Sequence, residues 1–319
     1  MSKLNIMFLG TPEFSVSSLK ILHEELSEVN VVKVISMPDR KAGRGKKMQS
    51  PAVIEYARDQ NLSFFQTANI NKEEELLKEL ESSSIDIIIV IAFSQFLGSR
   101  ILNIPRIGPF NIHTSLLPKY RGAAPIQYAL LNGDKVTGVS IQKMVKKMDA
   151  GDIVYSHEVN ISEEETSQTL FTKLESEASL GLRDFINEVI GDESSLNFLP
   201  QDESKASFAP IISKTDGLIK PLEESSNKIF NKSKAYFPWP GTYIYINDQR
   251  LKVINCEMVK SKVNAGTIST ALGTLVVGTI DGSIRLKTVQ LDGKKPISDS
   301  EYINGAKNKF PEFIITSKD

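Results

Sequence analysis

A single run of nine residues constrains the fold of this chain more than any other feature. Residues 85–93 read IDIIIVIAF and are apolar at every position except Asp86. Strands of a parallel sheet carry such continuous apolar runs because helices cover both of their faces. The run is far shorter than the roughly 20 residues that a membrane-spanning helix needs. It therefore predicts a buried strand at the centre of a parallel sheet.

The sequence around this run alternates between strand-like and helix-like segments. Strands are expected at residues 5–9, 31–36, 63–66, 107–112 and 137–144, and helices at residues 14–26, 51–59, 72–81 and 170–189. This alternation predicts an α/β fold, a doubly wound parallel sheet with helices on both faces.

The character of the sequence changes after residue 191. Residues 191–217 are rich in Ser, Asp, Gly and Pro, which is typical of a linker. A helix is then expected at residues 223–234, and strands at residues 242–246, 251–254, 266–269, 275–277 and 283–286. These short strands predict a second, smaller OB-like β-barrel domain. We expect a first domain at residues 1–204 and the OB-like domain at residues 205–319.

Charge is distributed unevenly between these two parts. The chain of 319 residues has a net charge of only −1. From Lys205 onward, 17 basic residues outnumber 11 acidic ones, for a net charge of +6, whereas the preceding part has 21 basic and 28 acidic residues, a net of −7. Such asymmetry suggests that the basic part binds a polyanion, although scatter in a lysine-rich chain would also produce it.

Cysteine and histidine are scarce. Cys256 is the one cysteine, which excludes a disulfide within the chain, and three histidines leave little material for a metal site. The start, MSKLNIMFLG, resembles a first strand more than a signal peptide. We therefore expect a cytoplasmic protein that holds no metal.

The largest group of candidate catalytic residues lies at residues 111–122, which begin where the expected strand at 107–112 ends. Asn111 and His113 are two residues apart and would point to the same side of a strand. Ligands of open α/β sheets bind at the carboxyl ends of the strands. An amide and an imidazole there could hold an oxyanion and move a proton. A single histidine could also be a core or capping residue.

The segment at residues 147–153, KMDAGDI, supplies candidate carboxylates. Asp149 and Asp152 flank a glycine in a tight loop after an apparent strand. A carboxylate beside an imidazole orients it and stabilises its protonated form. Either aspartate could instead cap the turn, and spacing alone does not choose between them.

Five cations gather within eight residues near the N-terminus, separated by two glycines: Arg40, Lys41, Arg44, Lys46 and Lys47. A charge run of this kind is usually a solvated surface loop. The glycines would also let such a loop approach a phosphate backbone closely.

Several motifs together resemble the folate-dependent formyltransferases. They are NIHTSLLPKYRGAAPIQYALLNGD at residues 111–134, KKMDAGDI at 146–153, FLGTPEF at 8–14, PDRKAGRGKK at 38–47 and FPWPGT at 237–242. The resemblance covers nearly the whole chain. It departs from the family pattern at Ser94, Gly98, Ile211, Lys220 and Pro221.

The resemblance implies roles for particular residues. It makes Asn111, His113 and Asp149 the catalytic trio, and so favours Asp149 over Asp152. It makes Ser115, Leu116, Leu117 and Pro118 the lining of the folate site. It also implies that the five cations at residues 40–47 contact the acceptor arm of a tRNA.

The implied reaction transfers the formyl group of 10-formyltetrahydrofolate to the amino group of methionine carried by initiator tRNA, for translation initiation. Methionyl initiator tRNA and the folate co-substrate would be the partners, with no membrane, and the protein would be a monomer. A nucleotide-linked amino sugar is the alternative acceptor, because sugar formyltransferases share the signature. A non-catalytic RNA-binding module is a further alternative, against which the complete catalytic trio argues.

Overall fold

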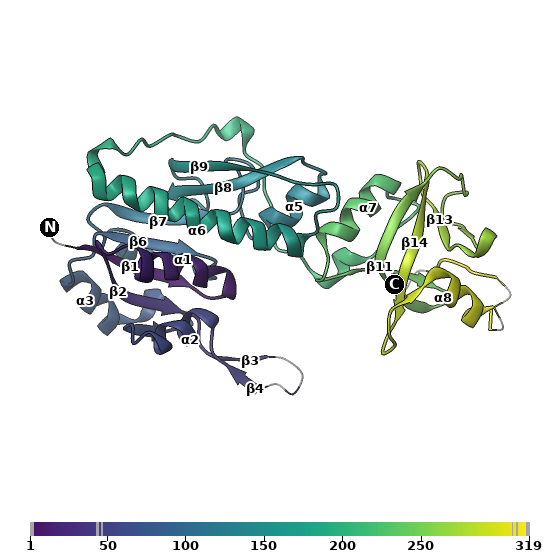
Figure 1. Ribbon diagram of the computed structural model, residues 1–319, viewed down its shortest axis with the longest axis horizontal. Helices are drawn as coiled ribbons and strands as arrows, with labels where there is room; N and C mark the ends of the chain where they lie inside the picture. The colour runs from purple at the N-terminus through teal and green to yellow at the C-terminus, as the bar shows by residue number, and fades with distance from the viewer. Residues whose placement is uncertain (1–2, 43–44, 46, 308, 311, 317–319) are drawn as a thin grey trace. The chain divides into compact units, whose positions relative to one another are not determined.

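The computed structural model describes residues 3–42, 45, 47–307, 309–310 and 312–316. The chain divides into two compact units (Figure 1). The first unit comprises Met1–Pro125, Val136–Asn160 and Phe171–Ala209, and the second comprises Ile126–Lys135, Ile161–Leu170 and Pro210–Asp319. The predicted boundary between residues 204 and 205 stays a prediction.

A seven-stranded sheet forms the centre of the first unit, in the order β5-β2-β1-β6-β7-β8-β9. Its strands are β1 (Leu4–Gly10), β2 (Val29–Ser36), β5 (Phe64–Gln66), β6 (Ile87–Ile91), β7 (Gly108–His113), β8 (Val136–Lys143) and β9 (Ile153–Asn160). The apolar run provides β6, which lies centrally between β1 and β7 and is buried at every position, as predicted.

Five neighbouring strands of this sheet pair in parallel, whereas β8 runs in the opposite direction to both of its neighbours, β7 and β9. Strand β7 pairs antiparallel with β8, and β8 pairs antiparallel with β9. Only nine residues, 144–152, connect β8 to β9. A parallel crossover needs a dozen residues or more, so this connection forces a hairpin. The predicted α/β fold is confirmed, with a mixed rather than purely parallel sheet.

Helices cover both faces of this sheet. They are α1 (Val16–Lys20), α2 (Ala52–Asp59), α3 (Glu74–Ser82), α4 (Ser99–Leu102) and the long α6 (Ser167–Asp192), the last of which begins in the second unit. Leu76, Leu77 and Leu80 of α3 pack with Ile88 and Val90 of β6. On β7, Phe110 contacts Phe185 of α6 with ring centroids 4.8 Å apart. Alternation along β7 therefore leaves Asn111 and His113 on the side opposite Phe110.

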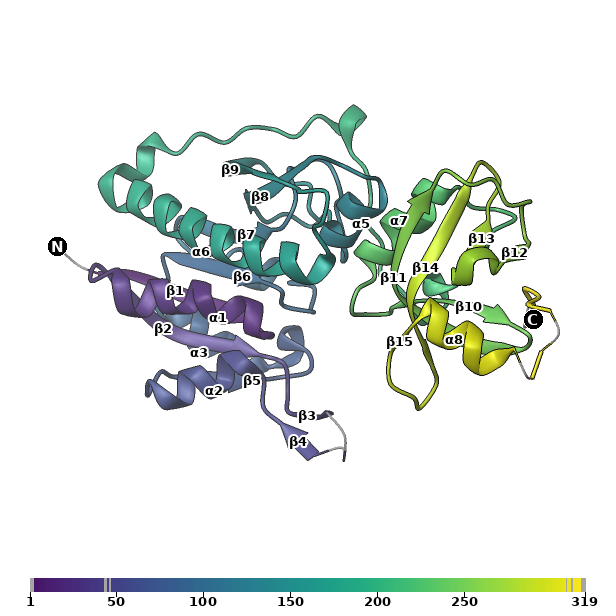
Figure 2. The ribbon, with the colours of Figure 1, turned by 45° about the vertical axis from the view of Figure 1, so that its right-hand side comes forward.

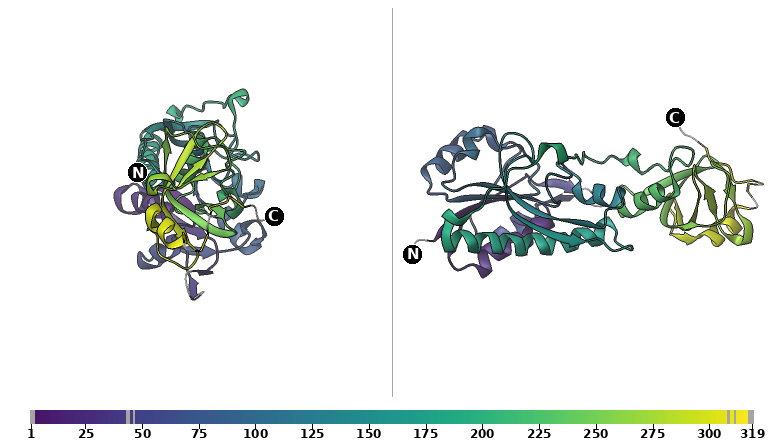
Figure 3. Two further views of the ribbon diagram at one scale, coloured as in Figure 1. Left: turned by 90° about the vertical axis from the view of Figure 1, so that its right-hand side faces the viewer. Right: turned by 90° about the horizontal axis from the view of Figure 1, so that it is seen from above.

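The segment after α6 is more than the predicted linker. It returns along the sheet as an extended chain (Figure 3). Leu199 exchanges backbone hydrogen bonds with Ile153 of β9. The N–H of Arg121 donates to the carbonyl oxygen of Ser207, and the carbonyl oxygen of Arg121 accepts from the N–H of Ala209. Residues 193–209 therefore belong to the first unit and reach the loop that follows β7, whereas residues 210–217 of the predicted linker belong to the second unit.

The second unit is built on a six-stranded antiparallel sheet (Figure 2). Its strands are β10 (Thr242–Ile246), β11 (Gln249–Val259), β12 (Ile268–Ser269), β13 (Val276–Gly278), β14 (Ser283–Leu291) and β15 (Ile297–Ser298), accompanied by α5 (Pro125–Leu131), α7 (Ser226–Ala235) and α8 (Asp299–Ala306). The predicted small β domain is confirmed as an antiparallel sheet. Strand β15 and helix α8 were not predicted.

Candidate active site

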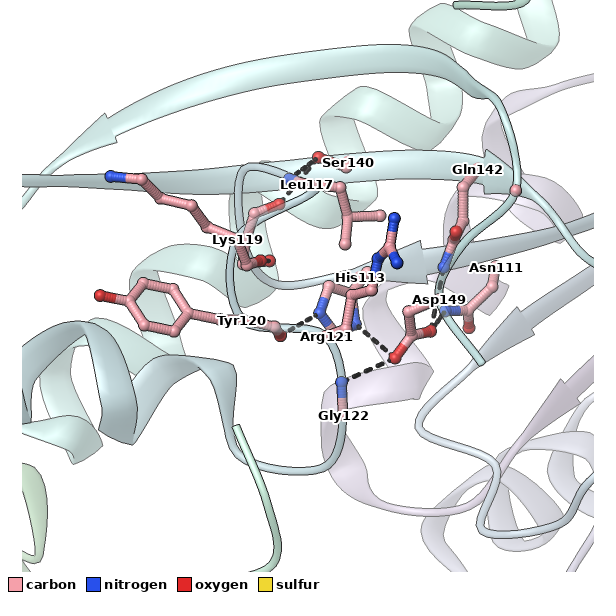
Figure 4. Close-up of polar contacts among 12 residues, drawn as sticks. Asn111, His113, Leu117, Lys119, Tyr120, Arg121, Gly122, Ser140, Gln142 and Asp149 are labelled. Atoms are coloured by element: carbon pink, nitrogen blue, oxygen red, sulfur yellow. Dashed lines mark hydrogen bonds and ion pairs between the residues drawn. The ribbon is translucent and has the colours of Figure 1, made fainter. Parts of the chain in front are cut away.

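The loop after β8 brings a carboxylate to the two polar residues of β7 (Figure 4). Asp149 Oδ1 accepts a hydrogen bond from Gln142 Nε2 at 2.9 Å, and Asn111 Nδ2 lies 3.5 Å from the same oxygen. Asp149 Oδ2 accepts from the backbone N–H of Gly122 at 2.8 Å and lies 3.9 Å from His113 Nδ1. The structure thus brings Asn111, His113 and Asp149 together, and it is the carboxylate of Asp149 rather than that of Asp152 that makes these contacts.

Both ring nitrogens of His113 face polar atoms, and its side chain is buried. Nε2 lies 2.8 Å from the carbonyl oxygen of Tyr120. A carbonyl oxygen only accepts hydrogen bonds, so Nε2 must carry a proton. In the neutral imidazole the lone pair is then on Nδ1, the nitrogen that faces Asp149.

The backbone of Asp149 is held in an uncommon conformation. Its φ is +50°, in the left-handed region, and Tyr120 on the opposite side of His113 has a φ of +59°. Non-glycine residues in this region cost of order 1–3 kcal/mol each and persist only where their surroundings determine them. Both strained residues contact the imidazole of His113, one through its carbonyl and one through its carboxylate.

Glycine is required two residues beyond Asp149. A Cβ atom on Gly151 would lie 1.7 Å from the carbonyl oxygen of Lys143. Since real Cβ atoms do not approach backbone oxygens so closely, any larger residue would push the loop away from β8. The close approach at Gly151 helps to fix the loop that carries Asp149.

A buried arginine contacts the extended segment that follows α6. Arg121 is 1% exposed and donates to Gln201 Oε1 and to the Glu203 carboxylate. Glu203 also accepts from Lys147 at 2.6 Å. Hydrogen bonds from Arg121 and then from Lys147 lower the pKa of Glu203 from its usual 4.5 to about 2. The extended segment after α6 is thereby tied to the Asp149 loop.

The four residues of the expected folate lining form a turn with a cis bond between Leu117 and Pro118. Ser115 is fully buried, and its hydroxyl donates to the carbonyl oxygen of Lys119. Leu117 is buried, and its N–H donates to Ser140 Oγ. Leu116 is half-buried and packs over Gly138, where a Cβ would lie 2.4 Å from its methyl group.

Three of the five cations near the N-terminus, Arg40, Lys41 and Lys47, lie on the strands of a hairpin (Figure 2). Strands β3 (Arg40–Ala42) and β4 (Lys47–Gln49) pair antiparallel. Arg40, Lys41 and Lys47 are exposed. Arg44 and Lys46 lie outside the residues that the structure describes.

Four further side chains around the candidate active site were not predicted from the sequence: Arg121, Ser140, Gln142 and Gln201. Ser140 and Gln142 alternate with Val139 and Ile141 on a buried stretch of β8, a signal that could have been used. Gln201 lies 52 residues beyond Asp149, and nothing local in the sequence connects them.

Within the described residues, no group of three or more His, Cys, Asp or Glu side chains could hold a metal ion. Among the helices in that same part of the chain, none is long and apolar enough to cross a membrane.

Comparison with known proteins defines the class to which this fold and site belong. Residues 4–186 match the model of the formyl transferase family, and residues 211–307 match that of the formyl transferase C-terminal domain. The chain therefore belongs to the formyl transferase family, as its motifs predicted.

Relatives that align along the whole chain carry a more particular name. A methionyl-tRNA formyltransferase of Sulfurihydrogenibium sp. (strain YO3AOP1) is 37% identical over 97% of this chain and 99% of its own. One of Lactobacillus johnsonii is 40% identical over 96% of both chains. Among solved structures, an N-formyltransferase from Helicobacter canadensis, in complex with folinic acid and dTDP-3-aminofucose, has a TM-score of 0.66 at 19% identity and covers 90% of this chain and 99% of its own. At that identity the likeness supports the fold alone.

Proposed function

We propose that this chain transfers the formyl group of 10-formyltetrahydrofolate to the amino group of methionyl initiator tRNA, producing N-formylmethionyl-tRNA for translation initiation. The main observation that supports the proposed reaction is that Asn111, His113 and Asp149 lie close together at the carboxyl end of β7. The full-length similarity to methionyl-tRNA formyltransferases supports methionyl-tRNA as the acceptor.

His113 acts through Nδ1 in this proposal. Its Nε2 proton is held by the Tyr120 carbonyl, so only Nδ1 is free to gain or lose a proton on the side of Asp149. Protonated Nδ1 donates to the formyl oxygen as negative charge develops there, and the nearby carboxylate stabilises the imidazolium.

Asn111 supplies a second donor for the same oxygen. Its amide lies on the same side of β7 as His113 and is oriented by the Asp149 carboxylate. A preorganised donor of this kind lowers a barrier by roughly 3–4 kcal/mol. The attacking α-amine has an ordinary pKa of about 8, so little is needed to supply it uncharged. Its nitrogen bonds to the formyl carbon and gives up one proton, which Asp149 accepts. As the oxyanion collapses, the bond between the formyl carbon and the folate nitrogen breaks, and that nitrogen leaves with the proton as tetrahydrofolate.

The folate co-substrate supplies the activated one-carbon group, and the chain supplies orientation and electrostatics. Ser115, Leu116, Leu117 and Pro118 would hold it. Strand register places Val90 beside Asn111, so the segment that follows β6 runs beside His113. Phe96 in that segment and Met148 in the Asp149 loop each leave 63% of their surface exposed. Exposed apolar side chains on segments that flank the site suit a ligand with aromatic rings.

The acceptor is bound as a polyanion. Arg40, Lys41, Arg44, Lys46 and Lys47 neutralise phosphates of the acceptor arm, and residues 205–319, with a net charge of +6, hold the tRNA without strong sequence preference. The chain acts as a cytoplasmic monomer.

Formyl transfer to competing acceptors tests this function. Labelled 10-formyltetrahydrofolate is offered with methionyl initiator tRNA, methionyl elongator tRNA and a UDP-linked amino sugar. We expect transfer to the initiator tRNA to exceed that to the other two, and tRNA affinity to fall steeply with salt. Preferential formylation of the amino sugar would establish the alternative acceptor, and tRNA binding without transfer would establish a binding module.

A further inference from the structure

Gln201 contacts the Asp149 loop from the extended segment after α6. Its Nε2 lies 2.7 Å from the carbonyl oxygen of Gly151, 3.0 Å from that of Asp149 and 3.2 Å from Gln142 Oε1. These three oxygens can only accept hydrogen bonds. The two protons of the amide nitrogen therefore point at the carbonyl oxygens of Asp149 and Gly151 and at Gln142 Oε1.

The opposite end of the same amide faces a cation. Gln201 Oε1 accepts from Arg121 Nη2 at 2.7 Å and from Nε at 3.1 Å. Rotating the amide by 180° would place its oxygen against three oxygens and its N–H groups against a guanidinium. The surroundings thus permit one orientation, and the fully buried Arg121 side chain fixes it.

We propose that Gln201 is a positioning residue that holds the Asp149 turn in its left-handed conformation and so aims the Asp149 carboxylate at His113. Without these donors, the carbonyl oxygens of Asp149 and Gly151 would lose partners, which is costly for half-buried groups. The strained φ of Asp149 would then relax, and its carboxylate would move. The effect on turnover rests on the proposed function; the effect on the turn does not.

Replacing Gln201 by glutamate tests both the effect on turnover and the effect on the conformation of the Asp149 turn. In Gln201→Glu the carboxylate keeps the shape of the side chain and still accepts from Arg121, but it presents oxygen to the two backbone carbonyls. We expect kcat for formyl transfer to fall about 10- to 100-fold, since a misplacement of ~1 Å can cost ~100-fold. KM for the folate should stay within about twofold, because Gln201 acts on Asp149 rather than on the substrate.

The N–H of Gly122 provides a readout that does not depend on activity, because it donates to Asp149 Oδ2 at 2.8 Å. In the full chain, NMR should find that Gln201→Glu changes the Gly122 amide shift and speeds its hydrogen exchange at least tenfold. Gln201→Met, which is neutral and of similar volume, should act alike if the glutamate variant does not fold. The matched control is Gln60→Glu at the C-terminal end of α2, an exposed site in the first unit, which should change neither kinetics nor the Gly122 signal.

The outcomes are distinguishable. An unchanged Gly122 signal with normal kcat in both Gln201 variants would overturn the positioning role, as would a loss of kcat with the Gly122 signal intact. A wild-type chain that forms no formylmethionyl-tRNA would refute the proposed function, and the Gly122 signal would still test the positioning role.

Discussion

Both units of this molecule bury charged and polar side chains, but they arrange them differently. In the first unit, buried polar groups on several elements converge on one loop around Asp149, whose backbone is strained. In the second unit, charged side chains form separate pairs in which at least one partner is buried. Lys232 of α7 donates to Glu224, and Arg285 of β14 donates to Asp299 at the start of α8.

The difference shows two uses of the same physical requirement, that buried polar groups must be hydrogen-bonded. The pairs of the second unit join chain segments to each other: Lys232 also donates to the carbonyl oxygen of Leu218, and Asp299 accepts from the N–H of Leu275. The cluster of the first unit instead orients one titratable side chain. Changes to the pairs should therefore reduce stability, and changes to the cluster should reduce turnover.

The largest effect is expected on the stability of the second unit. Burial lowers the pKa of Lys232, and hydrogen bonding to Glu224 opposes that shift. Glu224→Ala would leave the ammonium of Lys232 buried without its counterion, a loss of about 3–5 kcal/mol in the free energy of unfolding. Urea unfolding followed by the fluorescence of Trp239, the one tryptophan and a residue of the second unit, measures this.

Glu223→Ala is the matched control for that prediction. Glu223 is exposed and pairs with Lys220 at 3.1 Å, so its loss should cost ~1 kcal/mol at most. Equal destabilisation by the two substitutions would show that the Glu224–Lys232 pair has no structural role.

His113→Ala should lower turnover by at least ~100-fold, on the scale of losing one oxyanion donor or general acid. Urea unfolding of the second unit should not change. His157→Ala on β9, where the imidazole is half-exposed 3.4 Å from Glu177, should leave turnover unchanged. Comparable losses from both substitutions would contradict the assignment of His113.

The smallest effect concerns Glu203, whose folded-state pKa of about 2 lies below the ordinary 4.5. A depressed carboxyl pKa contributes stability above the unfolded-state value and loses it as the pH falls toward the folded-state value. Glu203→Gln should therefore lower the urea midpoint of the first unit at pH 6. The difference from wild type should shrink as the pH falls from 4.5 to 3. A difference that is constant with pH would exclude the ion pair with Arg121 as its cause.

Much of the fold followed from local patterns. The continuous apolar run fixed β6 because only a strand covered on both faces is apolar at successive positions, and the two-residue spacing placed Asn111 and His113 on one side of β7. The short β8–β9 connection is itself a signal for antiparallel pairing, which the prediction of a purely parallel sheet leaves out.

The site was less predictable because its parts are brought together by tertiary structure. Spacing could not choose between Asp149 and Asp152, since both flank the same glycine; the left-handed backbone of Asp149 turns its carboxylate toward Gly122. Gln201 was assigned to a linker on composition. Its amide acquires a partner only because Leu199 pairs with Ile153 and brings the segment to the site.

The most direct test of the account compares these two aspartates in one assay. Single-turnover transfer of labelled formyl from 10-formyltetrahydrofolate to methionyl initiator tRNA is measured for wild type, Asp149→Asn and Asp152→Asn. Asparagine keeps the size of the side chain but removes the charge beside His113, so the account predicts a loss of at least ~100-fold for Asp149→Asn and near-normal transfer for Asp152→Asn. Near-normal transfer by Asp149→Asn in a folded protein, or equal losses in the two variants, would contradict it.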